Sequence, residues 1–422
     1  MTTVASAGSP ATERSARSRL PALGALVAQV AQALANFVVQ VVAARELGAS
    51  GVGTFALLFG TIVMVTAVSS GLVGDSLTVL DRHEQAVRSA LWRITWTLVA
   101  AAAVLALLVG CSVLSVPAGV LFATSVATYV VADLARRVLM ARLEFWLLVV
   151  TDGAALLVTA GVLVAGSVTG DLRLEHFLAA LTAGQLTAAV VATRLLPPHE
   201  RLRPPSGWGD WRAVLGYGSW RAVQQFVRPT TLNAARWLVL VAAGTAAVGV
   251  LEVTRVLVAP AMLLVQGVGS YLFASYASDR DRPTAQLRAR ADRAAAVMLV
   301  GAAAVGAVVA VSLPLLEDLV TDGSFELSVV AVLGWSCYAA SCAAVMPYGS
   351  LAAVRGRQAA VLLVRLVDSV LSLLLVAVLL LGLGVDAQVT PWLLSAGAFF
   401  GGLLCRQVLL SGSTRHVGTA AP

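Results

Sequence analysis

The sequence contains no lysine, since all 29 of its basic side chains are arginine. It therefore has no glycine-rich phosphate loop with its lysine, which excludes direct use of ATP by this chain. Its four histidines are scattered and share no helix face, so they predict neither a zinc site nor a histidine relay. Its four cysteines lie in or at the ends of apolar runs, with no paired spacing on an outer loop, and are expected to pack between helices. We expect no cofactor and no metal.

Charge is also scarce, and long apolar runs take its place. Charged residues make up 12% of the chain and hydrophobic residues 59%, against about 25% and about 45 to 50% in soluble domains. Twelve apolar runs lie between residues 21 and 410, and a membrane-spanning helix needs about 20 such residues. The composition predicts an all-α polytopic membrane protein with about 12 transmembrane helices.

The connections between these runs are short. None has room for a soluble domain, and no outer loop is large enough to carry the catalytic groups of a membrane glycosyltransferase, so we do not expect an enzyme. The predicted organisation is a disordered cytoplasmic arm over residues 1–18, an N-terminal six-helix lobe over 19–195, a cytoplasmic linker over 196–212, a C-terminal six-helix lobe over 213–410 and a cytoplasmic tail over 411–422.

The arginines alternate between loops. The N-terminal arm, the even-numbered loops and the tail hold 22 of them, with Arg136 and Arg137 counted in the fourth loop, whereas the alternate loops hold only Arg45 and Arg173. Positive charge flanking spans is retained in the cytoplasm. We therefore predict a multi-pass protein of the cell membrane with both termini cytoplasmic. The basic loops suit anionic membrane lipids as partners, and no nucleic acid is required to explain them.

One glycine motif occurs twice. Gly48-Ala49-Ser50-Gly51-Val52-Gly53 recurs 196 residues later as Gly244-Thr245-Ala246-Ala247-Val248-Gly249, each time between two long apolar segments. Two like halves are typical of transporters, in which paired bundles rock about a central site to expose it to each side in turn.

Polar residues inside the spans give candidate sites. In the first span, Gln29, Gln32, Asn36 and Gln40 follow a helical spacing that places them on one face, as expected of a cavity wall. The alternative is that these amides hydrogen-bond to neighbouring helices and hold the bundle together.

The later spans add positive charge at depth. The deep residues are Arg221, Gln225, Arg228 and Arg236 in the seventh span, Arg255 in the eighth and Arg365 in the eleventh. Arg221 and Arg236 lie near span ends, where arginine side chains can reach an interface. Arg228 lies mid-span, where an unpaired arginine costs about 2.5 to 3.5 kcal/mol, which favours a cavity-facing role. A net cationic lumen predicts an anionic cargo, and the arginine fork suits phosphate.

Three carboxylates share this depth. Asp152, Glu252 and Asp368 are candidates for ion coupling, and the alternative is that each pairs with a nearby arginine, as Glu252 with Arg255 or Asp368 with Arg365. Asp75 and Asp133 are placed near cytoplasmic ends and are interpreted as interfacial.

Three segments carry a family resemblance: Ala44–Ala56, its counterpart Val241–Glu252, and Arg136–Met140 followed by Phe145 and Asp152. They resemble the polysaccharide-export flippases of the O-antigen type, in the superfamily that also holds the lipid II flippases and the multidrug and toxic compound extruders. The resemblance implies two V-shaped six-helix lobes around a central cavity, and a cargo of saccharide on a polyprenyl diphosphate. It also implies cationic residues near the diphosphate, here Arg228 and Arg255, with Arg221 and Arg236 as additions.

These observations predict a flippase that carries a lipid-linked saccharide from the cytoplasmic to the outer leaflet by alternating access. The amides of the first span stand where lipid II flippases tend to have arginine, which favours a glycan other than the peptidoglycan precursor. Glycan-synthesis membrane proteins are further candidate partners. The alternatives are a cation/drug antiporter of the multidrug and toxic compound extrusion type and a non-transporting membrane scaffold.

Overall fold

The fold is taken from a computed structural model of the 422-residue chain, which describes residues 10–142, 144–201, 207, 209–279 and 282–409. Within these ranges, the side chains of residues 10–26, 28–31, 270, 273, 274, 277, 278, 408 and 409 lie outside the description.

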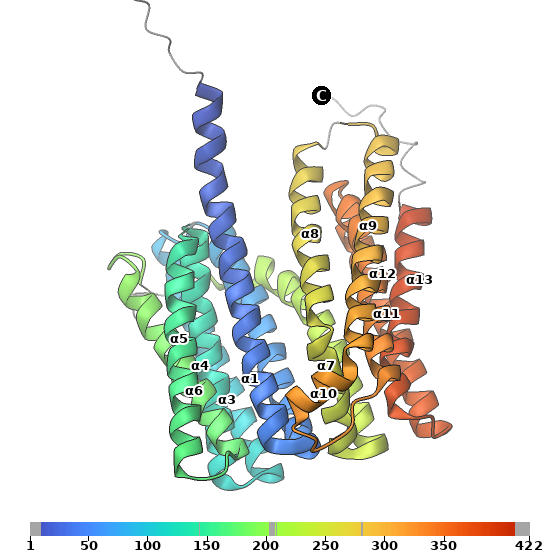
Figure 1. Cartoon of the computed structure of the whole chain (residues 1–422). Coiled ribbons are helices and arrows are strands. Elements are labelled where there is room, and N and C mark those ends of the chain that lie inside the picture. Colours follow the sequence, from blue (N-terminus) through green and yellow to red (C-terminus); the bar gives the residue numbers. More distant parts are fainter. Residues whose placement is uncertain (1–9, 143, 202–206, 208, 280–281, 410–422) are drawn as a thin grey trace, which may run out of the picture. The chain divides into compact units, whose positions relative to one another are not determined.

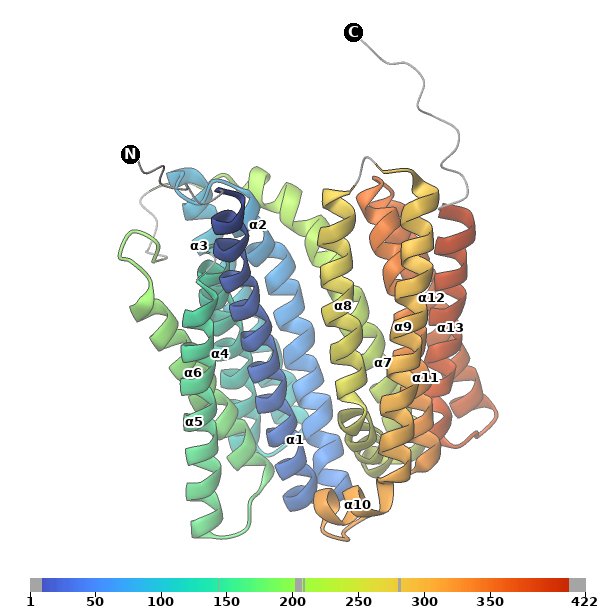
Figure 2. The ribbon, with the colours of Figure 1, turned by 45° about the horizontal axis from the view of Figure 1, so that its top comes forward.

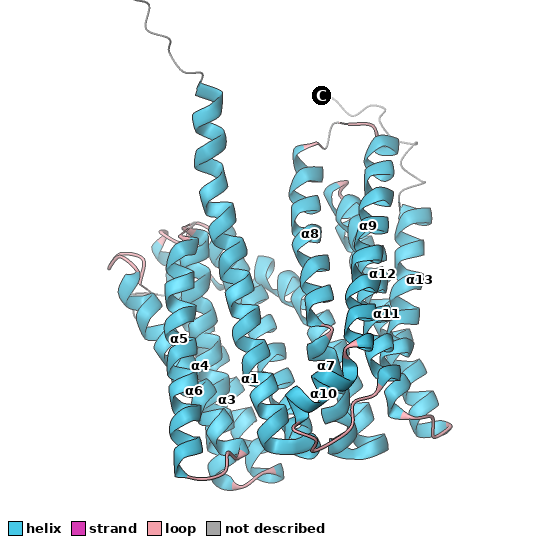
Figure 3. Ribbon diagram, in the orientation of Figure 1, coloured by secondary structure: helices cyan, strands magenta, loops and turns pink. Residues whose placement is uncertain are grey.

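The described residues form helices joined by short connections (Figures 1 and 3). The α-helices are α1 Pro10–Ser69, α2 Asp75–Val79, α3 Gln85–Val113, α4 Val116–Ala141, α5 Phe145–Thr169, α6 Leu174–Leu195, α7 Trp211–Leu257, α8 Ala259–Ser278, α9 Thr284–Val311, α10 Leu313–Thr321, α11 Val329–Val354, α12 Gln358–Ala377 and α13 Thr390–Leu404. Short π- or 3₁₀-helical turns are η1 Ser70–Gly74, η2 Val378–Gly382, η3 Ala387–Val389 and η4 Cys405–Leu409. The predicted all-α membrane fold is confirmed.

Ten apolar helical stretches of the described chain are long enough to cross a membrane, and two of them are double-length. The double stretches, Gln32–Val79 and Trp211–Leu257, each contain one non-helical glycine, Gly48 in α1 and Gly244 in α7. Their φ angles of 65° and 83°, with ψ near 180°, lie in a region open essentially to glycine alone. Each glycine turns the chain back, so each double stretch contributes to two of the twelve predicted crossings, with α8 continuing the short part of α7 that follows Gly244.

The N-terminal segment differs from the prediction. Helix α1 begins at Pro10, inside the arm predicted to be disordered over residues 1–18, while residues 1–9 and the predicted tail over 411–422 lie outside the described residues. The reason is local: proline is well placed at the first helical position, and the alanine, glutamate and arginine that follow are good helix formers.

The described chain forms two compact units. Unit 1 comprises Met1–Val39 and Val65–Gln225, and unit 2 comprises Gln40–Met64 and Phe226–Pro422, in each case over the described residues. The units therefore do not follow the two halves of the sequence. The segment around the Gly48 turn packs in unit 2, and the beginning of α7 packs in unit 1.

Each unit has its own core. In unit 1, α4 packs against α3 and α6, α6 packs against α5, and the buried core includes Leu77, Leu91, Leu139 and Val214. In unit 2, α11 packs against α8, α9 and α13 (Figure 2), around a core that includes Tyr276, Met298 and Leu351.

The two copies of the glycine motif pack against each other within unit 2. A Cβ atom at Gly53 would collide with the carbonyl oxygen of Thr245, and one at Gly249 would collide with the carbonyl oxygen of Ala49. Positions 49 and 53 are the equivalents of 245 and 249, so the contact is reciprocal, as at a two-fold interface. The hydroxyls of Ser50 and Thr245 lie 2.7 Å apart and add a hydrogen bond.

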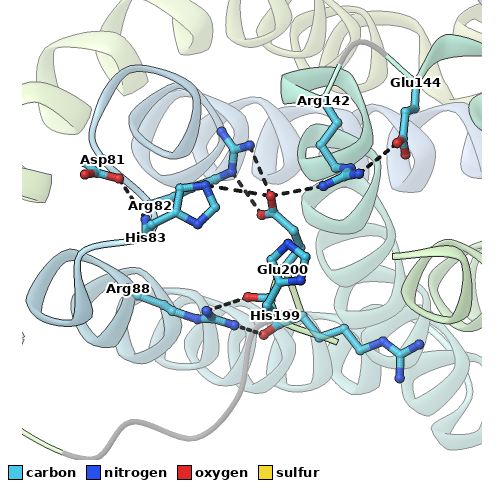
Figure 4. Close-up of polar contacts among 9 residues, drawn as sticks. Asp81, Arg82, His83, Arg88, Arg142, Glu144, His199 and Glu200 are labelled. Carbon is cyan, nitrogen blue, oxygen red and sulfur yellow. Dashed lines mark hydrogen bonds and ion pairs between the residues drawn. The ribbon is translucent and has the colours of Figure 1, made fainter. Parts of the chain in front are cut away.

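The connection between α6 and α7 is fastened to unit 1 through Glu200 (Figure 4). The Glu200 side chain is 5% exposed and accepts hydrogen bonds from Arg82 Nε at 3.1 Å and Arg142 Nη1 at 3.2 Å. His83 Nε2 lies 3.8 Å from the same carboxylate. Arg88 donates to the backbone carbonyl of His199 at 2.6 Å. Part of the predicted 196–212 linker is therefore held against the ends of α3 and α4.

The glycine contact predicts a large steric effect. Gly53→Val should lower the free energy of unfolding by about 1 to 3 kcal/mol, because the new side chain must push apart two backbones that touch. Gly216→Val is the matched control, since a Cβ there meets open space. Thermal unfolding of the purified protein in detergent checks this, and equal melting temperatures for the two variants would contradict the reciprocal packing.

The Glu200 cluster predicts a pH-dependent contribution to stability. Burial raises the pKa of Glu200, but the hydrogen bonds and charges of Arg82, His83 and Arg142 lower it by more, so its pKa lies below the usual value. The stabilisation is therefore complete above the unfolded pKa of about 4.3 and is lost as the pH falls through the folded pKa.

Glu200→Gln should accordingly lower the free energy of unfolding at pH 7 by about 1 to 3 kcal/mol. Its difference from the wild type should shrink as the pH falls below the unfolded pKa of about 4.3, and it should disappear below the folded pKa, where Glu200 is protonated in both states. Glu84→Gln, an exposed change in the same region, is the control. A difference that persists unchanged in acid would show that the charge of Glu200 is not what holds the connection.

Candidate functional site

Glu252 lies at the centre of a buried charge triad in unit 2. Its side chain is 5% exposed and accepts hydrogen bonds from Arg236 Nη2 at 2.9 Å and from Arg255 Nε at 3.0 Å. The turn at Gly244 explains the geometry, because residues 236 and 252 lie equally far before and after it and so reach the same level. The predicted Glu252–Arg255 pair is confirmed. Arg236, expected to reach an interface, is instead paired internally.

The triad extends to the outer part of the first span. Arg255 Nη2 lies 3.5 Å from Gln40 Oε1. A cavity of about 20 Å³ beside the triad is lined by Arg236, Glu252, Arg255 and Trp335 among others, which is room for about one water molecule. The charges of Arg236 and Arg255 are thus largely committed to Glu252.

Arg228 has a different environment. It lies in α7, only partly exposed, and its polar neighbours are the hydroxyl of Tyr338 and the thiol of Cys342, both in α11. Among the described residues it makes no ion pair within 4.0 Å. This mid-span arginine therefore has polar neighbours but no carboxylate to neutralise it.

Arg365 of α12 contributes a second uncommitted charge. Its side chain is exposed, and within the described part of the chain it forms no ion pair, although Asp368 lies one turn away. Asp368 instead accepts from Ser372 Oγ at 3.5 Å, so the alternative in which it pairs with Arg365 is not observed.

Taken together, unit 2 places four guanidinium groups, Arg228, Arg236, Arg255 and Arg365, in one electrostatic cluster with two carboxylates, Glu252 and Asp368. Four positive against two negative charges leave an excess of two positive charges. One of these charges belongs to the triad of Arg236, Glu252 and Arg255, and the other to Arg228 and Arg365 together with Asp368. Arg228 and Arg365 are more accessible than the core of the triad. A cationic cluster of this kind can bind a group with at least two negative charges.

Unit 1 holds a second intramembrane charge pair. Arg136 of α4 is paired with Asp152 of α5 and donates from Nη2 to Gln32 Oε1 at 3.0 Å. The prediction that Arg136 and Arg137 lie in the fourth loop is wrong, because α4 continues to Ala141 and keeps both inside a helix. Asp152 Oδ2 is buried without a hydrogen-bond partner among the described residues.

Arg221 and Gln225, at the beginning of α7, also belong to unit 1. Arg221 Nε donates to Asp75 Oδ2 at 2.8 Å, and Gln225 Nε2 lies 3.4 Å from the same oxygen. Asp75 is 14% exposed and forms an ion pair with Arg221. Its interpretation as an interfacial residue stays a prediction.

The amide stripe of the first span is divided between the units. Gln32 bonds within unit 1 and Gln40 within unit 2, Asn36 is half-buried in unit 1, and the side chain of Gln29 lies outside the described residues. The two bonded amides support the alternative in which these residues hold the helices together.

Two aromatic residues of α11 went unnoticed in the sequence. Tyr338 is a polar neighbour of Arg228, and Trp335 Nε1 donates to the carbonyl of Leu251 at 2.9 Å. The available signal was their polar tips, because a buried tyrosine or tryptophan usually finds a hydrogen-bond partner.

Known structures share this fold. An inward-facing multidrug resistance MATE family transporter of the MOP superfamily matches with a TM-score of 0.74 over 91% of this chain and 96% of its own, at 13% identity. A MATE protein in the straight conformation matches with a TM-score of 0.63 over 93% and 95%, at 13% identity. A MOP superfamily transporter from Pyrococcus furiosus, described by the reverse polarity of its binding pocket, matches with a TM-score of 0.61 over 92% and 94%, at 10% identity.

The chain therefore has the fold of the MATE transporters of the MOP superfamily. No family model and no curated protein matches the sequence. At these identities the likeness concerns the fold alone.

The triad predicts an asymmetric response to neutralising its carboxylates. Glu252→Gln should lower the free energy of unfolding by about 3 to 5 kcal/mol, because it leaves two buried guanidinium groups without a counter-charge. Asp368→Asn is the matched control and should have a smaller effect, since Asp368 forms no ion pair in the described structure. Thermal unfolding in detergent distinguishes the two, and a more damaging Asp368→Asn would contradict this assignment.

Proposed function

We propose that this chain is a membrane exporter that works by alternating access. The support is its fold, which it shares along most of its length with MATE transporters, one of them solved facing inward and another facing outward. The duplicated turns at Gly48 and Gly244 add to this, because related halves are the usual basis of alternating access.

The cargo we propose is anionic. The observation that carries this proposal is the excess of arginine in unit 2, where Arg228 and Arg365 have no carboxylate within ion-pair distance in the described structure. Leaving such charges unpaired in a membrane is expensive unless they face water or a ligand. An arginine fork binds phosphate oxygens through two parallel hydrogen bonds.

A polyprenyl-diphosphate-linked saccharide fits this chemistry. Its diphosphate would supply the counter-charge that Arg228 and Arg365 lack. Arg255 and Arg236 would contribute the positive charge that Glu252 does not neutralise. Its movement would run from the cytoplasmic to the outer leaflet, for polysaccharide or cell-envelope glycan synthesis, with anionic lipids and glycan-synthesis membrane proteins as partners. The loop arginines support a membrane orientation with both termini cytoplasmic.

A cation or drug antiporter is the second candidate, and the comparisons favour it, since the matching MATE structures include multidrug resistance transporters. Within the chain, the orphaned Oδ2 of Asp152 offers a negative atom in unit 1. The polarity of unit 2 favours the anionic cargo. The Pyrococcus furiosus transporter offers a parallel, because the reverse polarity of its binding pocket suggests a different function for that protein.

Reconstitution separates the two candidates. Proteoliposomes should transfer a fluorescent polyprenyl diphosphate saccharide between leaflets and should not accumulate a cationic dye such as ethidium. Arg228→Ala and Arg365→Ala should each slow transfer about tenfold or more, because a charge-assisted hydrogen bond contributes about 1.5 to 3 kcal/mol. Arg194→Ala, an exposed arginine of α6, should leave transfer unchanged. Dye accumulation without lipid transfer would establish the antiporter instead.

A further inference from the structure

One face of α3 in unit 1 carries a groove. Among the described helices, α3 packs mainly on α4, and a groove of about 710 Å³ runs along α3 outside its buried face. The lining begins at Trp92, Arg93 and Trp96 and continues past Ala100 to Val104 and Leu108. Steps of four residues from Trp92 to Leu108 keep these side chains on one side of the helix.

The groove has a charged end and an apolar length. Arg93 is the only charged residue in its described lining. Trp96, one turn further along, is 46% exposed, and arginine with tryptophan is typical of the interface between a bilayer and water. Beyond the small side chain of Ala100, Val104 and Leu108 are exposed apolar residues. A ligand that fits both parts is amphiphilic, with a negative headgroup and an apolar chain.

The connection between α6 and α7 positions Arg93. Asp210 donates from its backbone N–H to the carbonyl of Ala86 at 3.0 Å, and a Cβ atom at Gly209 would collide with the backbone nitrogen of Ala90. Arg93 Nη2 donates to the carbonyl of Gly207 at 3.1 Å. Positions 86, 90 and 93 lie on one side of α3, so the connection runs along the beginning of this helix. A neutral carbonyl orients the guanidinium without neutralising it.

The length of the groove suits a lipid chain. From Arg93 to Leu108 the helix advances 15 residues, or about 22 Å at about 1.5 Å per residue. One leaflet of a bilayer contributes about half of the hydrocarbon thickness of about 30 Å. An acyl chain whose headgroup lies at Arg93 therefore ends within the groove.

We propose that this groove binds one anionic phospholipid, with its phosphate on Arg93 and an acyl chain along α3 toward Leu108. The arginine fork suits phosphate oxygens. A zwitterionic lipid brings its own cation close to Arg93, so charge complementarity favours a lipid with a net negative charge. A helix of another protein, or of a second copy, would cover the apolar length but press apolar side chains on the guanidinium, which is costly in a membrane.

The bound lipid has a consequence for the connection. Because the guanidinium of Arg93 contacts both the phosphate and the carbonyl of Gly207, a lipid that holds Arg93 in place also stabilises the contact between the connection and α3. The site is independent of the proposed cargo, since its residues belong to unit 1 and lie outside the arginine cluster of unit 2.

Native mass spectrometry of the full chain tests the headgroup. The protein, delipidated in detergent, is given equal amounts of phosphatidylglycerol and phosphatidylcholine with the same acyl chains. The first lipid to bind should be phosphatidylglycerol, preferred about fivefold, which is the contribution of about one arginine near a membrane surface. Arg93→Gln should lower this preference about fivefold. Arg93→Lys, which also loses the arginine fork but keeps the charge, should retain most of it.

A second pair of variants tests the groove. Ala100→Phe fills the middle of the groove and leaves Arg93 unchanged, so it should remove the preferred first lipid. Leu157→Phe, at a 74% exposed position of α5, should bind lipid like the wild type. Arg194→Gln, which neutralises an exposed arginine outside the groove lining, should keep the preference for phosphatidylglycerol.

Three results would overturn the proposal. They are equal binding of the two lipids by the wild type, an unchanged preference in Arg93→Gln, and normal binding of the first lipid by Ala100→Phe. A wild-type dimer that Ala100→Phe converts to a monomer, with lipid binding unchanged, would assign the groove to a second copy of the chain instead.

Discussion

Every guanidinium group held inside a membrane needs a counter-charge or water, and this requirement shapes both units of the chain. Arg136 forms an ion pair with Asp152, and Arg221 forms one with Asp75. Arg236 and Arg255 both pair with Glu252. Apart from Glu252 with Arg255, which are three residues apart on one segment, each pair joins helices or helix segments separated in sequence, so these pairs also hold the helices together. Removing one partner of such a pair is far more destabilising than replacing both partners by apolar residues, because the remaining charge stays buried without a counter-charge.

The two deep arginines that have no carboxylate partner among the described residues indicate the cargo. Arg228 has the hydroxyl of Tyr338 as a neighbour, and neither Arg228 nor Arg365 forms an ion pair in the described structure. A chain that neutralises its other deep arginines so regularly would be expected to neutralise these two as well, unless a ligand does so. This contrast is the reason to infer an anionic cargo within a fold whose solved members include multidrug transporters.

The sequence predicted the fold well and the site only in part. Hydropathy and the duplicated glycine motif were sufficient for twelve crossings, because the length of an apolar run and a positive φ at glycine are local properties. Pairing depends on which helix faces meet, which is not local. Spacing along one helix predicted Glu252 with Arg255 correctly, but the partner of Arg236 required the turn at Gly244, and that of Arg221 required the contact between α7 and Asp75.

The boundaries of helices caused the remaining errors. The prediction counted Arg136 and Arg137 in the fourth loop, whereas α4 continues to Ala141 and brings them to Asp152 and Asp133. An arginine can extend an apolar helix past its hydropathic end because its stem is apolar and only its tip requires polar company. Hydropathy alone cannot distinguish such an extension from a loop.

The reciprocal contact of Gly53 with Thr245 and of Gly249 with Ala49 bears on how the two halves can diverge. Because each motif packs against the other, a bulky side chain in one copy collides with the main chain of the other copy. A smaller side chain in that second copy cannot relieve a collision with its backbone. The polar residues inside the spans do not pack against their equivalents in this way. Gln32 and Gln40 of the first half correspond, 196 residues later, to Arg228 and Arg236 of the second. The internal repeat is therefore still recognisable at this pair of turns, whereas the polar residues around the turns differ between the two halves.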